Sequence, residues 1–164
     1  MDLYPWVVIA HVFLVIVAFG AHGTSAFAML QARREPDRAR LSAVLDLSQA
    51  SLGVAGVALL LAVLMGIVAA IMGNHFGHAW PFAAILVVVV VFGAMTPLGA
   101  NPMSDLRKTL GMRGRGDRPS DPPRQPGSDE DVRAAQARLR PELLSAIGIA
   151  AIAVLVWLME AKPF

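Results

Sequence analysis

The four histidines of this sequence are its most informative candidates for chemistry, because the chain contains no cysteine. Two of them, His11 and His22, lie in one long uncharged stretch. A polar side chain in such a stretch is costly and marks a candidate functional site. On a helix these two side chains lie within about 20° of each other and roughly 16 Å apart along the axis. One metal ion therefore cannot bind both.

The other two histidines, His75 and His78, lie in a short turn between apolar stretches, on the same side of the predicted membrane as His11. Imidazole is a ligand for copper, zinc and haem iron. We therefore predict a cofactor at His11, either haem or copper, and a metal site at which His11, His75 and His78 converge. The alternative is that the His75–His78 pair is solvated in an exposed turn.

A second group of polar residues is predicted at the opposite end of the apolar stretches. This intramembrane cluster consists of His22, Ser25, Gln49, Thr96 and Asn101. One interpretation is that these groups satisfy one another and cap helix ends, as buried polar groups generally do. The alternatives are a proton relay, a small-molecule pocket or part of a permeation path.

The elements that position these residues are membrane-spanning helices. Of the 164 residues 56% are hydrophobic and 16% charged, against roughly 25% charged in soluble domains. Four uncharged stretches are long enough to cross a bilayer, for which about 20 residues suffice. We predict an all-α fold: a polytopic membrane protein forming one antiparallel four-helix bundle over residues 1–164, with spans at about 4–30, 48–72, 80–100 and 142–160.

The basic residues define the predicted orientation. Thirteen of the fourteen Lys and Arg residues lie in the two connections after the first and third spans, and the other, Lys162, follows the last span. The positive-inside rule places both connections in the cytoplasm and both termini outside. Because these basic residues flank the membrane spans and set their orientation, we expect the lipid bilayer as the partner and not nucleic acid.

The longer cytoplasmic connection, residues 103–140, is predicted to have two parts. Residues 111–128 are dense in Gly, Pro and charge, which favours a flexible linker. Ser128 followed by three acidic residues is a helix start, so residues 129–140 are predicted to form a short surface helix. That helix either binds anionic lipid or a partner, or is simply a solvated lead into the fourth span.

One face of the second span carries small residues at every fourth position. These residues are Ala58, Ala62, Gly66 and Ala70, and such a helix-packing face lets another backbone approach closely. The neighbouring helix could belong to the same chain, to a second copy in a homo-oligomer or to another membrane subunit. The sequence leaves these options open.

The sequence resembles a group of small bacterial four-helix membrane proteins of unknown function, distantly related to the copper-resistance D (CopD-like) membrane domain. The likeness lies in Leu3-Tyr4-Pro5-Trp6 followed by His11, in the small residues near Gly20-Ala21, and in the number of spans. It implies a bacterial inner-membrane protein with a link to metal or haem handling, transferable only to His11. Further metal-binding residues of a copper transporter are missing.

Three functions are consistent with these observations. The first is a protein that binds a metal or haem through His11. The second is a structural or assembly subunit that packs through the small-residue face, and the third is a small transporter. The sequence contains no nucleophile–base pair, phosphate loop or intramembrane carboxylate pair, so a non-enzymatic function is favoured.

Overall fold

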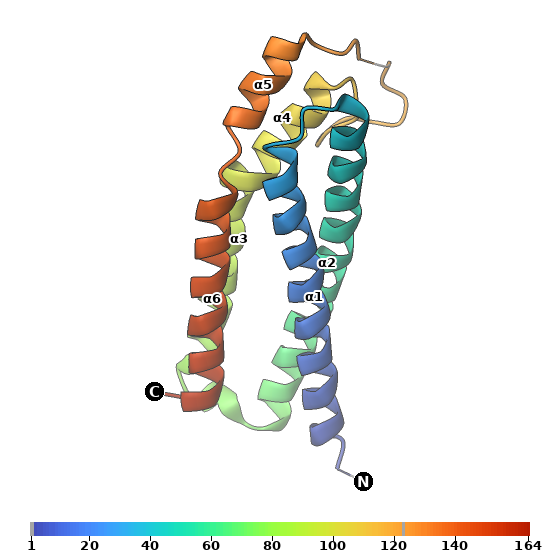
Figure 1. Cartoon of the computed structure of the whole chain (residues 1–164). Helices are drawn as coiled ribbons and strands as arrows, with labels where there is room; N and C mark the ends of the chain where they lie inside the picture. Colours follow the sequence, from blue (N-terminus) through green and yellow to red (C-terminus); the bar gives the residue numbers. More distant parts are fainter. Residues whose placement is uncertain (1, 123) are drawn as a thin grey trace.

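The computed structural model describes residues 2–122 and 124–164 and consists of helices (Figure 1). In chain order they are α1 (Tyr4–Ala32), α2 (Arg38–Met72), the 3-10 turn η1 (His75–Gly77), α3 (Trp80–Met95), the π-helical segment η2 (Thr96–Ala100), α4 (Asn101–Thr109), α5 (Asp129–Ala137) and α6 (Pro141–Ala161). Four stretches are long and apolar enough to cross a membrane. The predicted all-α, four-span fold is confirmed.

The spans form two antiparallel hairpins, α1 beside α2 and α3 beside α6 (Figure 1). Three of these helices begin with a proline. Pro5, Pro81 and Pro141 lie in the first turn of α1, α3 and α6, where the backbone N–H has no partner within the helix and its absence costs nothing. Asp37 caps α2 by accepting a hydrogen bond from the Arg40 N–H at 2.8 Å. Both chain ends lie at one end of the bundle, and α4 and α5 lie at the other.

The helices extend beyond the uncharged stretches from which the spans were predicted. α2 begins ten residues before the expected position 48, since the Asp37 cap starts the helix among charged residues. The third span does not end at the predicted position 100 but continues through η2 into α4, which ends at Thr109. Pro97 has no backbone N–H to donate within the helix, and a π-helical turn at this position lets the helix continue past it. In contrast, α5 ends at Ala137, three residues before the predicted position 140.

The hydrophobic core lies at the α4–α5 end of the bundle. Its buried members come from five helices and the α5–α6 connection: Met29, Ala32, Leu41, Leu45, Met103, Leu106, Val132, Ala135, Leu139 and Leu144. Along the spans themselves most large apolar side chains are exposed, which fits surfaces that face lipid. This core therefore holds the two hairpins together at one end of the bundle. We refer to that end, with α4, α5 and the connections around them, as the helical cap.

The predicted orientation can be tested by cysteine labelling, because the chain has no thiol of its own. Cysteines introduced at Asn74 and Pro163 should react with an impermeant maleimide added to intact cells, whereas one at Ser120 should react only after lysis. The reason is that nearly all cations lie on the helical-cap side of the spans. Labelling of a cysteine at position 120 in sealed cells would show that the true orientation is the opposite of the predicted one.

Candidate functional site

The seam between α1 and α2 contains His11. Positions 4, 11, 18 and 25 of α1 are seven residues apart and so lie on one face of the helix. Three of them make hydrogen bonds with α2 or with η1, which follows it: His11 with Ala62, Ser25 with Ser48, and Tyr4 with His75. Ala18 is buried. This heptad face is the surface through which α1 packs on α2.

The small-residue face of α2 is occupied by α1 of the same chain. Ala58, Ala62 and Ala70 are buried, and Gly66 lies directly under the His11 ring. A Cβ atom at Gly66 would lie 2.9 Å from His11 Cε1 and 3.1 Å from its Nδ1, which is closer than real Cβ contacts. The glycine is therefore required where the imidazole crosses the helix.

The contact made by His11 fixes its chemical form. Its Nδ1 lies 2.7 Å from the carbonyl oxygen of Ala62. A carbonyl can only accept a hydrogen bond, so Nδ1 carries the proton and donates it. In the neutral ring this leaves the lone pair on Nε2, and no residue among 2–122 and 124–164 hydrogen-bonds to that atom. An imidazole held through Nδ1–H with a free Nε2 is the arrangement of many histidine metal ligands.

His75 has a structural environment that the sequence did not reveal. Its Nε2 lies 3.2 Å from the Tyr4 hydroxyl, and its ring packs at 5.5 Å from that of Trp80. A Cβ at Gly73 would lie 2.5 Å from His75 Nε2, so the glycine that directly follows α2 accommodates a second histidine. In the sequence Tyr4 belongs to the opening Leu3-Tyr4-Pro5-Trp6 segment, one heptad before His11, and nothing there pairs it with His75. Gly73 has no signal beyond its residue type.

The three histidines do not form the metal site predicted from the sequence. His11 contacts Ala62 of α2, His75 contacts Tyr4 of α1, and His78 is exposed. Within the described part of the chain, no three His, Asp or Glu side chains come close enough to hold a metal ion. The imidazoles do not converge because His11 lies over Gly66 of α2, whereas His75 lies against Gly73, seven residues later and just after the end of α2.

The intramembrane polar cluster is likewise only partly assembled. Ser25 Oγ and Ser48 Oγ are 2.8 Å apart and buried between α1 and α2. Thr96 donates to the carbonyl of Phe92 in its own helix. His22 is half-buried, Gln49 and Asn101 are exposed, and none of these three hydrogen-bonds to another member in the described residues. The single cross-helix link is thus the serine pair.

Buried and charged contacts tie α5 and α6 to the first hairpin. The Gln136 amide on α5 is buried and donates to the carbonyls of Ala32 and Glu35, both at 2.8 Å. Arg33 donates to both carboxylate oxygens of Glu142, with the shorter distance 2.6 Å. The two Gln136 bonds satisfy carbonyls at the end of α1 and just after it, which have no partner within the helix.

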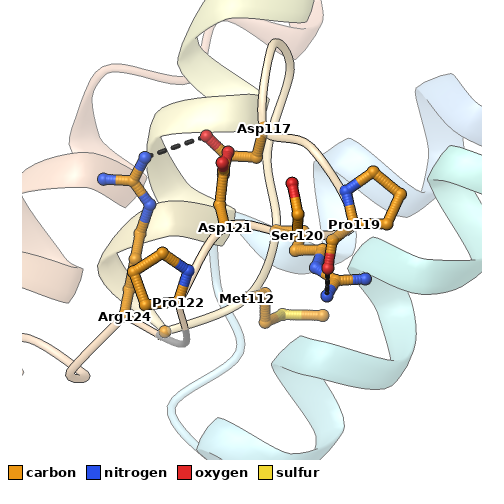
Figure 2. Close-up of a pocket in the computed structure, with 9 residues that line it drawn as sticks. Met112, Asp117, Pro119, Ser120, Asp121, Pro122 and Arg124 are labelled. Atoms are coloured by element: carbon orange, nitrogen blue, oxygen red, sulfur yellow. Dashed lines mark hydrogen bonds and ion pairs between the residues drawn. The ribbon is translucent and has the colours of Figure 1, made fainter.

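The segment 111–128 makes defined contacts around Asp117, whose side chain is 9% exposed. Asp117 accepts hydrogen bonds from the Gly114 N–H at 2.9 Å and from Arg124 at 2.8 Å (Figure 2). The Gly114 bond, followed by the Arg124 guanidinium, lowers the pKa of the Asp117 carboxyl. Asp117 and Arg124, together with Met112, Ser120 and Pro122, line an open hollow of about 740 Å³. Flexibility of this linker stays a prediction, and Pro123 lies outside the described residues.

The ends of the linker meet, which leads to a prediction about its removal. Gly127 N–H donates to the Thr109 carbonyl at 2.8 Å, so the residues between them form an excursion from a closed base. Deleting residues 114–125 should leave the bundle folded, because a shorter loop changes the closure free energy by less than about 1 kcal/mol. Size-exclusion chromatography and thermal unfolding in detergent check this result, and loss of the folded protein would show that the excursion is required.

Comparisons with known proteins add no relative: no family model, no curated protein and no solved structure matches this chain.

Proposed function

We propose that this is a non-enzymatic membrane protein that binds haem through His11, whose Nε2 would hold the iron. The observation that carries the proposal is the 2.7 Å contact from Nδ1 to the Ala62 carbonyl, which fixes the tautomer and leaves Nε2 with its lone pair. An unmade hydrogen-bond acceptor inside hydrocarbon costs on the order of 1–3 kcal/mol. A ligand on Nε2 would remove that cost.

The donor set favours haem over copper. A porphyrin supplies four nitrogen ligands to its iron, so a single protein imidazole can complete a stable site. A copper site needs several protein ligands, and the described residues place no second histidine or carboxylate beside His11 in such a group. When bound, haem would supply electron-transfer or gas-binding chemistry, while the chain holds the imidazole through Ala62 and Gly66.

A second candidate is a subunit that packs against another membrane helix, although not through the face of α2 expected from the sequence, since α1 covers that face. Gly53, Gly56 and Gly93 have no described heavy atom within 4 Å of an added Cβ. Gly56 also lines an apolar hollow of about 270 Å³ with Val88 and Phe92. Open glycines on membrane helices suit close helix contacts.

An absorption spectrum and metal analysis of the purified protein distinguish the two candidates. We expect a Soret band and iron at up to one atom per chain when the protein is produced in haem-replete cells. A colourless, metal-free preparation that co-purifies stoichiometrically with another membrane protein would instead support the subunit. A small transporter is less well supported, because Ser25 is the one member of the predicted polar cluster that makes a cross-helix side-chain hydrogen bond within the described residues.

A further inference from the structure

Three segments of the chain meet at one corner of the helical cap: the end of α1, the end of α5 and the start of α6. The Gln136 amide bonds the carbonyls of Ala32 and Glu35, and the Arg33–Glu142 ion pair at 2.6 Å joins α1 to α6. Residues 33–35 therefore lie next to residues 136–142 although about a hundred positions separate them. We call this place the arginine corner.

The corner presents three arginines without carboxylate partners: Arg34, Arg138 and Arg140. All three are exposed, and none lies within ion-pair distance of a described carboxylate. Five other cations of the helical cap do have acidic partners, namely Arg33, Arg38, Arg107, Lys108 and Arg124. These five cations pair with four acidic residues, Asp46, Asp117, Asp129 and Glu142. No described carboxylate forms an ion pair with the three exposed arginines of the corner.

The fold holds this charge in place. Leu139 is 1% exposed and belongs to the hydrophobic core, so the residues on either side of it, Arg138 and Arg140, are fixed in position at the backbone. Four arginines and two glutamates lie among residues 33–35 and 138–142, a net charge of +2. One glutamate, Glu142, is already engaged by Arg33.

The corner also lies at the level where the chain enters the hydrocarbon. α1 ends at Ala32 and α6 begins at Pro141, and the residues from Leu143 onward are uncharged until Glu160. A guanidinium group forms bidentate hydrogen bonds with phosphate oxygens, and phospholipid phosphates occupy this level. We propose that the arginine corner binds the headgroup of an anionic phospholipid and so attaches the helical cap to the membrane surface.

The test is a titration of the full chain in neutral detergent with phosphatidylglycerol, with phosphatidylcholine as the zwitterionic comparison, followed by native mass spectrometry. The variant R34Q/R138Q/R140Q removes the corner charge. Each arginine near an anionic surface contributes about a factor of five in affinity, so we expect on the order of a 100-fold loss of phosphatidylglycerol binding. Phosphatidylcholine binding should not change.

The matched control is R115Q/R118Q/R133Q, which removes the same charge from exposed arginines of the cap that lie outside the corner. It should retain binding within about a factor of five, the effect of one arginine. Equal losses in both variants would overturn the proposal, because general basicity would then explain binding. Where the corner variant is not recovered folded, R34Q and R140Q are compared singly with R115Q.

The source of the phosphate group is tested separately. Inorganic phosphate and glycerol 3-phosphate at millimolar concentration should fail to displace phosphatidylglycerol from the wild-type protein, because they lack acyl chains that contact the adjacent spans. Displacement by either soluble anion would show that the arginine corner binds a free phosphate compound. That result would contradict the proposal that it binds a phospholipid headgroup. The proposal does not depend on haem at His11, so either can fail without the other.

Discussion

Replacing Gly66 with alanine is expected to destabilise the α1–α2 hairpin by about 1–3 kcal/mol, the usual cost of overpacking a filled site. The new Cβ would lie 2.9 Å from His11 Cε1, so the imidazole must leave its position over α2. Its bond to the Ala62 carbonyl would be lost as well. Reversible unfolding in mixed micelles measures the change in the free energy of unfolding.

A matched control lies in the same helix. Gly53 has no described atom within 4 Å of an added Cβ, so Gly53→Ala should be neutral or stabilising. In addition, removing the ring by His11→Ala should abolish most of the penalty of Gly66→Ala, giving a coupling energy of at least about 1 kcal/mol. Additive effects of the two substitutions would contradict the contact between them.

Replacing His11 with glutamine is expected to remove the cofactor completely. The amide of glutamine can still donate a hydrogen bond to the Ala62 carbonyl, so the hairpin should remain folded. However, an amide does not replace the imidazole nitrogen as an iron ligand. The iron content and Soret absorbance of the purified variant should therefore fall to background, while its thermal unfolding stays close to that of the wild type.

The control for this prediction is His22→Gln. His22 lies on the same helix, roughly 16 Å away along its axis, and makes no contact with the His11 ring that the structure describes. Its substitution should leave the cofactor in place. Full retention of haem by His11→Gln, or its loss from both variants, would contradict the assignment of His11.

The spans could be read from the sequence because each consists of a long uncharged run, and lipid imposes that composition locally. The helix ends were less predictable. Asp37 starts α2 outside the apolar run, and the π turn at Pro97 carries the third span onward. Both depend on backbone hydrogen bonds that hydropathy does not report.

Contacts between distant positions account for what was missed at the site. The small residues of α2 indicated a packing face, but nothing in the sequence showed that His11 would lie over Gly66, 55 positions later. Gln136 likewise appears in a charged helix, yet its amide is buried because the end of α1 has unpaired carbonyls. Likewise, nothing in the sequence of the histidine-rich turn showed that His75 would contact Tyr4 of α1.

Chemical rescue of His11→Gly tests directly whether an imidazole at this position is the iron ligand. The truncated side chain leaves a space over Gly66 that free imidazole can enter. We predict that purified wild type shows a haem Soret band, that His11→Gly lacks it, and that adding haem with imidazole to the variant restores it. A wild type without haem, a variant that retains it unaided, or no recovery with imidazole would contradict the account.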